Sequence, residues 1–227
     1  MKSYGQFCSF ARALDFLGER WTLLIVRELL CGSTRFNELR RGIPRISRTM
    51  LSARLRELLD AGVIVRSPGE GGRYALTQAG RELGGAVREL GTWGQRWLPR
   101  TLPREELDQE ALLWDMRRRV RAEELPAAPL VMRVEIAEAR KISVRYFLLR
   151  RSEVSLCLEN PGFPEELRLS VSLRTLTSWW RGDISLAGAR SEGMIVDGRR
   201  EHVRCFPRWF ERYLFAGVAP ARATERA

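Results

Sequence analysis

The chain has 227 residues, 44% of them hydrophobic, which is enough to bury the cores of two ordinary domains. Its 39 Lys and Arg against 28 Asp and Glu give a formal net charge of +11, which favours a polyanionic partner such as nucleic acid or an anionic membrane surface. Four scattered cysteines and one histidine do not make a zinc-binding set, so we expect no metal and no other cofactor. No apolar run approaches the ~18 residues that span a bilayer. We therefore expect a cytoplasmic protein with reduced thiols and no membrane partner.

The positive charge is concentrated in the first part of the chain. Residues 1–98 carry 16 Lys and Arg against 9 Asp and Glu, a net charge of +7, which leaves +4 for the remainder. Within residues 35–56 there are seven arginines and a single acid, Glu38. Such a stretch is typical of a nucleic-acid-binding surface, although a charged helix face is more often simply solvated.

Taken in chain order, the apolar spacing first predicts four helices, a β-hairpin and a long helix. Thr34 is the expected N-cap of the third helix and Ser47 that of the fourth. The turn sequence PGEGG joins the two strands of the hairpin. The expected elements are helices at 8–17, 20–30, 35–43 and 47–61, strands at 63–67 and 73–76, and a helix at 77–98.

The long helix at 77–98 contains an unusual number of glycines. Each glycine in a helix interior costs roughly 1 kcal/mol relative to alanine. We expect close packing against a partner helix to offset this cost. The glycines are Gly80, Gly84, Gly85, Gly91 and Gly94.

The rest of the chain predicts a linker and a mixed second part. Two prolines make 98–104 the best linker candidate, and a charged helix follows at 105–124. Apolar and polar residues then alternate, which indicates strands with one buried face. The expected elements are strands at 130–136, 154–158, 167–173 and 194–198, and helices at 174–182, 185–193 and 201–217.

The helix expected at 47–61 has two different faces. At 100° per residue, Leu51, Leu55, Leu58 and Leu59 share one side and predict an anchor in a core. The other side carries small, hydroxyl and arginine side chains, which suit the major groove because arginine can pair with guanine edges and hydroxyls reach phosphates. The helix N-terminus adds backbone N–H donors for a phosphate.

A short helix, a turn with Gly and Pro, a basic helix and a hairpin follow the order of a winged helix-turn-helix. In that motif the second helix enters the major groove and the wing touches the DNA backbone. Glu70 at the wing tip argues against strong insertion into the minor groove. The predicted DNA-binding residues are Arg35, Arg45, Ser47, Arg48, Thr49, Ser52, Arg56 and Arg73.

Residues 8–98 resemble the HxlR type of winged-helix transcriptional regulators. The resemblance rests on motifs in fixed order: a cysteine before the first helix, LGERWTLLIVREL, RFNELRRGIPRIS, LSARLRELLDAG and YALTQAG. It implies a homodimer that binds double-stranded DNA at an inverted repeat, with the first and last helices of the domain forming the dimer interface.

Residues 130–215 resemble, more loosely, the sterol carrier protein family, type two. The matching stretches are LRLSVSLRTLTSWWRGDISLAGARSEGMIVDG and FPRWFERYL. The resemblance implies a sheet covered by helices, with an apolar pocket for a small hydrophobic ligand. The residues predicted to line it are Trp179, Trp180, Met194, Phe206, Trp209 and Phe210, which could equally fill an ordinary core.

Cys8 is a redox candidate, because regulators of the HxlR type can sense oxidants through a cysteine at this position. Arg12 lies one helical turn further on and is expected to lower the pKa of the thiol if the two side chains face each other. The alternative is a small buried residue at the dimer interface.

The sequence as a whole predicts an α+β protein. Its expected parts are a winged helix-turn-helix domain at 1–98, a linker and connecting helix at 99–129, a sterol-carrier-like domain at 130–217 and a disordered tail at 218–227. The expected function is a homodimeric, ligand-responsive transcriptional regulator rather than an enzyme, since no nucleophile and base converge. The alternatives are a carrier of lipids or hydrophobic metabolites and a redox-sensing regulator acting through Cys8.

Overall fold

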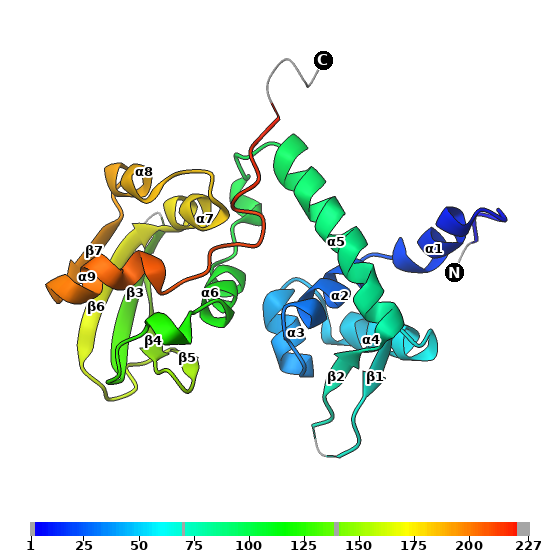
Figure 1. Ribbon diagram of the computed structural model, residues 1–227, viewed down its shortest axis with the longest axis horizontal. Helices are drawn as coiled ribbons and strands as arrows, with labels where there is room; N and C mark the ends of the chain where they lie inside the picture. Colours follow the sequence, from blue (N-terminus) through cyan, green and yellow to red (C-terminus); the bar gives the residue numbers. More distant parts are fainter. Residues whose placement is uncertain (1–2, 70, 139–140, 222–227) are drawn as a thin grey trace. The chain divides into compact units, whose positions relative to one another are not determined.

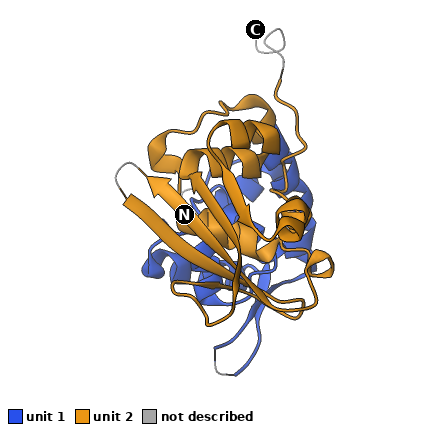
Figure 2. Ribbon diagram, turned by 90° about the vertical axis from the view of Figure 1, so that its left-hand side faces the viewer, with its two compact units in different colours: residues 1–93 blue, residues 94–227 orange. Residues whose placement is uncertain are grey.

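The computed structural model describes residues 3–69, 71–138 and 141–221. The chain divides into two compact units, unit 1 at residues 1–93 and unit 2 at residues 94–227 (Figure 2). Within the described residues, no helix combines the length and the apolar character needed to cross a membrane.

Unit 1 has the element order of a winged helix-turn-helix domain, as predicted (Figure 1). Strands β1 and β2 pair antiparallel, with Val65 opposite Ala75, and form the wing. The last turn of α5 extends into unit 2. The elements are α1 Ser9–Leu17, α2 Thr22–Leu30, α3 Phe36–Gly42, α4 Arg48–Asp60, β1 Ile64–Arg66, β2 Tyr74–Leu76 and α5 Gln78–Trp97.

Side-chain caps define where the two central helices begin. Ser47 caps α4 as predicted, since its hydroxyl accepts the Met50 backbone N–H at 3.1 Å. The prediction for α3 was wrong by one residue, because its N-cap is Arg35 and not Thr34. The Glu38 carboxylate accepts the backbone N–H groups of Thr34 (2.8 Å) and Arg35 (3.0 Å), and this fixes the start of the helix.

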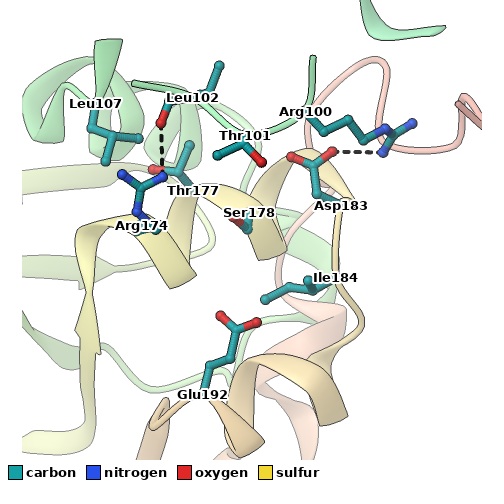
Figure 3. Close-up of a pocket in the computed structure, with 10 residues that line it drawn as sticks. All are labelled: Arg100, Thr101, Leu102, Leu107, Arg174, Thr177, Ser178, Asp183, Ile184 and Glu192. Carbon is teal, nitrogen blue, oxygen red and sulfur yellow. Dashed lines mark hydrogen bonds and ion pairs between the residues drawn. The ribbon is translucent and has the colours of Figure 1, made fainter. Parts of the chain in front are cut away.

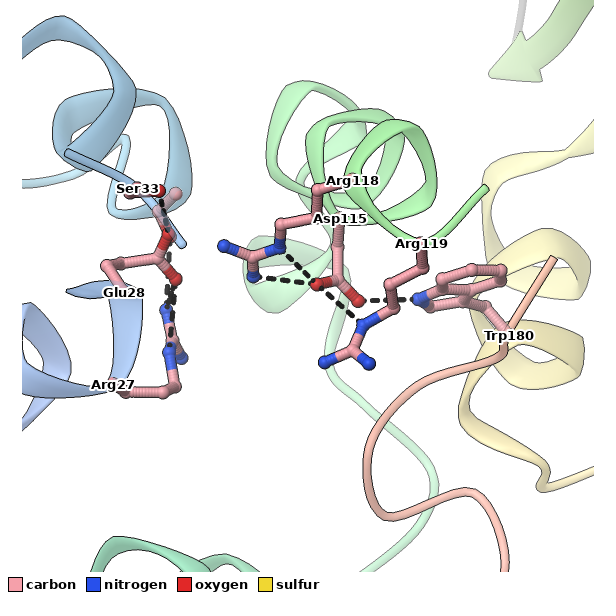
Figure 4. A network of polar contacts seen from close by, with 8 residues as sticks. Arg27, Glu28, Ser33, Asp115, Arg118, Arg119 and Trp180 are labelled. Atoms are coloured by element: carbon pink, nitrogen blue, oxygen red, sulfur yellow. Dashed lines mark hydrogen bonds and ion pairs between the residues drawn. The ribbon is translucent and has the colours of Figure 1, made fainter. Parts of the chain in front are cut away.

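A buried carboxylate stands inside unit 1 (Figure 4). Glu28 on α2 is fully buried, and Arg27 donates to it at 2.8 Å. The Ser33 hydroxyl donates to the other carboxylate oxygen at 3.3 Å, and Arg27 also donates to the Gly42 carbonyl at 3.2 Å. Because the polar groups satisfy one another, this cluster links the end of α2 to the end of α3.

The glycines of α5 have different surroundings. A Cβ on Gly80 would lie 2.3 Å from the Val63 carbonyl oxygen, so this glycine packs against the chain leading into β1. A Cβ on Gly84 would lie 3.4 Å from the Leu30 side chain of α2, an ordinary van der Waals contact that does not require glycine. Gly85 faces open space. Only part of the glycine content is therefore explained by packing within one chain.

Unit 2 is a five-stranded sheet with helices against its apolar face (Figures 1 and 2). The strand order is β5-β4-β3-β6-β7; β3 and β6 pair parallel, and the other neighbours pair antiparallel. Its elements are η1 Arg104–Glu106, α6 Gln109–Arg118, η2 Ala122–Glu124, β3 Leu130–Glu138, β4 Lys141–Leu149, β5 Val154–Cys157, β6 Glu165–Ser172, α7 Leu173–Arg181, α8 Leu186–Ser191, β7 Ile195–Gly198, α9 Arg200–Cys205 and η3 Phe206–Arg208.

Two helices predicted for unit 2 are wrong in extent. The final helix, expected at 201–217, is α9, which ends at Cys205 and is followed by the 3₁₀ turn η3 to Arg208. The helix expected at 105–124 is α6 with a short 3₁₀ turn on each side. Pro207, which has no backbone N–H, follows the end of α9, and a backbone pairing keeps both segments from continuing as helices. The backbone near Val120 pairs with that near Phe210, with Arg121 donating to the Trp209 carbonyl at 2.8 Å, so neither segment can stay helical.

The segment expected as linker and connecting helix at 99–129 lies within unit 2. Leu113 and Met116 of α6 are fully buried in its core, against the apolar face of the sheet. Of the tail expected at 218–227, residues 222–227 lie outside the described residues. Ala221 is buried, and its backbone N–H donates to the Arg96 carbonyl at 2.9 Å.

Candidate nucleic-acid interface

Helix α4 is anchored by its leucines, as predicted. Leu51, Leu55 and Leu58 are between 0% and 2% exposed and pack in the core of unit 1, and Leu59 is partly buried beside them. Three large apolar side chains held along one face leave the helix little freedom to rotate about its own axis. The opposite face is therefore presented to solvent in a defined orientation.

All of the predicted DNA-binding residues are exposed. Arg48 stands at the start of α4, and Ser52 and Arg56 continue the same face at helical spacing. The exposed set comprises Arg35, Arg45, Ser47, Arg48, Thr49, Ser52, Arg56 and Arg73. The structure thus leaves this basic and hydroxyl-bearing face free of protein in the single chain.

The Arg54 side chain, in contrast, is committed to the fold. It is 13% exposed and forms ion pairs with Glu57 and Glu19, each at 2.6 Å. Burial lowers the pKa of Arg54, but the hydrogen bonds and charges of Glu57 and Glu19 outweigh it and raise the pKa overall. A guanidinium held by two carboxylates has little capacity left for phosphate or base contacts.

The beginning of α4 offers a further anion-binding feature. The Ser47 hydroxyl accepts a hydrogen bond from the Met50 N–H. The first backbone N–H groups of a helix lack intrahelical acceptors, and here these are the N–H groups of Arg48 and Thr49. A phosphate at this helix end would meet these donors and the positive end of the helix dipole.

The wing, formed by β1 and β2, adds two arginines to unit 1. Arg73 is exposed directly before β2, and the Arg66 guanidinium of β1 lies 5.5 Å from the ring centroid of Tyr74. Glu70, the acid expected at the tip, lies outside the described residues. The hairpin therefore presents one arginine at the end of β1 and one directly before β2.

The six residues predicted to line a hydrophobic pocket are instead buried in the core of unit 2. The Trp179 and Phe206 rings stack with centroids 5.7 Å apart, and Phe210 meets both Phe206 (5.6 Å) and Trp180 (6.0 Å) edge to face. Such packing favours the core role over the pocket role. The set is Trp179, Trp180, Met194, Phe206, Trp209 and Phe210, and each is at most 3% exposed.

A buried ionic cluster supports this aromatic core (Figure 4). The Asp115 carboxylate accepts the indole N–H of Trp180 at 2.8 Å and pairs with Arg118 (2.7 Å) and Arg119 (3.2 Å). Burial raises the pKa of Asp115, but the two guanidinium groups and the indole outweigh it, so the pKa lies below its ordinary value. The aspartate is therefore ionised in the folded protein at neutral pH.

Cys8 is exposed and forms the N-cap of α1. The backbone N–H groups of Ala11 and Phe10 lower the pKa of its thiol. The lowering thus comes from the beginning of the helix, whereas the sequence had pointed to Arg12. The alternative, a small residue buried at the dimer interface, stays a prediction, because the exposure refers to the single chain.

Unit 1 is a winged helix-turn-helix with an arginine-bearing, outward-facing second helix, the architecture of the DNA-binding winged-helix class. A family model described as an HxlR-like helix-turn-helix matches residues 16–102. The HTH-type transcriptional regulator Rv3095 of Mycobacterium tuberculosis is 48% identical over 98 residues, which are 40% of this chain and 60% of that protein. YvaP of Bacillus subtilis, also named an HTH-type transcriptional regulator, is 40% identical over 93 residues, 39% of this chain and 86% of that protein. The reduced form of the transcriptional regulator YodB from B. subtilis is 34% identical, with a TM-score of 0.35 over 40% of this chain and 93% of that one.

The chain belongs to the HxlR-like helix-turn-helix family. It covers 60% of the length of Rv3095, and the family match lies almost wholly within unit 1. The resemblance of unit 2 to sterol carrier proteins stays a prediction.

Proposed function

We propose that the protein is a transcriptional regulator that binds double-stranded DNA as a homodimer, with α4 of each subunit in the major groove of an inverted-repeat operator. One observation carries the proposal: Arg48, Ser52 and Arg56 form an exposed face on a helix whose other face is locked into the core. Arginine pairs with guanine edges, and the exposed hydroxyls reach bases or phosphates. Two copies related by a two-fold axis would read half-sites about 10 bp apart.

The dimer is proposed to form through α1, the segment before it, and α5. Phe7 is 99% exposed and Phe10 is 72% exposed, and α1 projects from the side of unit 1 (Figure 1). On α5, Leu90 and Trp93 are also more than half exposed. Apolar side chains of this size gathered on two helices are costly to leave in water, and a second copy would cover them.

The proposal is tested by sequencing the DNA fragments that the purified protein retains from a fragmented genome, followed by gel shifts on the recovered site. Arg48→Ala and Arg56→Ala should each weaken specific binding by about tenfold or more. Arg204→Ala removes the same charge from an exposed position in unit 2 and should leave binding unchanged. Retention without sequence preference, or equal losses in all three variants, would refute base readout by α4.

Unit 2 is proposed to control DNA binding through a small ligand. Coupling requires that the ligand bind the DNA-competent and DNA-incompetent dimers with different affinity, and a difference of about 1–3 kcal/mol suffices for strong control. The predicted hydrophobic ligand would have to enter the packed aromatic core, and the same packing weighs against a lipid carrier.

A redox response through Cys8 is the second candidate, favoured by the exposure of the thiol in the single chain and by its lowered pKa. Treatment with diamide or peroxide should change the DNA affinity of the wild type and not that of Cys8→Ser. The other three cysteines are half-buried and serve as internal controls for nonspecific oxidation. Equal responses of the two proteins would remove Cys8 from the mechanism.

A further inference from the structure

Unit 2 contains a cavity of about 230 Å³ beside α7 (Figure 3). A cavity of about 150 Å³ accommodates benzene, so this one has room for a somewhat larger molecule. Its walls carry both charged and apolar side chains, and none of the six aromatic and methionine residues discussed above lines it. It is thus distinct from the hydrophobic pocket that the sequence predicted.

One ion pair on the wall has partners on both of its side chains. Arg100 donates to Asp183 at 2.7 Å and to the Val218 carbonyl at 2.6 Å. The second carboxylate oxygen of Asp183 faces Arg181 at 3.4 Å, and the Asp183 side chain is only 10% exposed. These groups stabilise one another and hold the wall in place.

Two other charged residues on the wall, Arg174 and Glu192, are exposed to solvent. Arg174 donates to the Leu102 carbonyl at 2.9 Å, and Glu192 accepts the Thr175 hydroxyl at 3.3 Å. In the part of the chain that the structure describes, neither side chain has an ion-pair partner. Figure 3 shows them at different edges of the cavity, with the Glu192 carboxylate directed into it.

The rest of the wall is suited to a short apolar chain. Leu107 and Ile184 line the cavity and are also packed against the core of unit 2. The Thr101 and Ser178 side chains add hydroxyl groups. A wholly apolar ligand would desolvate Arg174 and Glu192 without pairing them, which is unfavourable, and a ligand of one sign would be repelled by one of the two.

We propose that this cavity binds a small zwitterion of the α-amino acid class, with its carboxylate on Arg174, its ammonium group on Glu192 and its side chain against Leu107 and Ile184. Arginine binds a carboxylate through two parallel hydrogen bonds, and each charge-assisted bond is stronger than a neutral one. The site deepens the proposed function, since it supplies the effector of the regulator. Binding itself does not depend on that function.

The test measures thermal stabilisation and calorimetric binding of the full chain, without DNA, with each proteinogenic L-amino acid in turn. At least one amino acid with an aliphatic side chain should bind, and Arg174→Ala and Glu192→Gln should each weaken it by about tenfold or more. Analogues of that amino acid lacking either the amino or the carboxyl group should lose a similar factor.

Two variants serve as matched controls. Arg190→Ala and Glu201→Gln change exposed residues of α8 and α9 outside the cavity and should bind like the wild type. Binding of no amino acid, or binding that neither cavity variant nor the analogues weaken, would overturn the proposal. A failure of DNA binding would appear separately, in gel shifts without any amino acid.

Discussion

Arg54 and Arg56 stand two positions apart on α4 and serve different purposes. Arg54 is held by Glu19 and Glu57, while Arg56 extends into solvent with Arg48 and Ser52. Helical periodicity predicted the exposed residues correctly, because the leucines define which side is buried. The ion pair between Arg54 and Glu19 could not be predicted from this periodicity. Glu19 is distant from Arg54 in sequence, and the two side chains meet only in the folded unit.

At the same scale, Asp115→Asn should destabilise unit 2 by about 2 kcal/mol, because it removes a carboxylate that satisfies two arginines and an indole. The folded-state pKa lies below the ordinary value of 3.8, so the stabilisation is present above about pH 4 and is lost as the pH falls below it. Urea unfolding followed by tryptophan fluorescence at several pH values measures the difference, which should shrink in acid.

The control for this prediction is Asp197→Asn. Asp197 pairs with Arg168 at 3.2 Å, but both side chains are more than half exposed, and such pairs contribute little. A loss of stability as large as that of Asp115→Asn, or a difference between Asp115→Asn and wild type that persists unchanged below about pH 3, would contradict the account given for Asp115.

At the scale of elements, the sequence predicted the helices of unit 1 more reliably than those of unit 2. Strand β4 was missed because its buried residues do not alternate cleanly: Phe147, Leu148 and Leu149 are all buried. The helix expected at 201–217 was drawn too long: Pro207 marks its end locally, but the pairing between residues near 120 and 210 is not visible in any local pattern. Helix α4 was predicted well because its N-cap residue and its apolar spacing both indicate a helix over the same residues.

The glycines of α5 give a matched pair of tests. Gly80→Ala places a Cβ 2.3 Å from a backbone carbonyl, which cannot move without displacing β1, so we expect unit 1 to lose about 2 kcal/mol or more. Gly85→Ala enters open space within the chain and should stabilise it by about 0.5–1 kcal/mol. Thermal unfolding measures both. Equal effects of the two substitutions would show that helix propensity, and not contact, decides.

At the scale of the whole molecule, Trp93→Glu and Phe10→Glu should convert the proposed dimer into a monomer, because each places a charge in an apolar interface. Light scattering after size-exclusion chromatography measures the mass. Ile142→Glu, at an equally exposed apolar position of β4, should leave the dimer intact. A wild-type protein that is monomeric at micromolar concentration would refute the interface.

The same dimer should bind DNA with a strong dependence on salt. Contact with about 6–10 phosphates predicts a loss of roughly 10³–10⁵ in affinity between about 50 and about 200 mM salt. Arg35→Ala and Arg45→Ala should each reduce the slope of log K against log salt by about two per dimer if they contact phosphate. A slope of log K against log salt that corresponds to only one or two phosphate contacts would contradict a basic DNA-binding surface on both subunits.

By itself the sequence determined the winged helix-turn-helix unit, the cap of α4 and the residues on its open face. These features depend on the spacing of residues within a few helical turns, so they involve only residues that are close together along the chain. Only the tertiary structure decided that Trp179 and Phe206 stack in a core, that α6 belongs to unit 2, and that Arg174 and Glu192 border one cavity. Those arrangements depend on which distant segments meet, and burial and charge pairing select them only once the chain has folded.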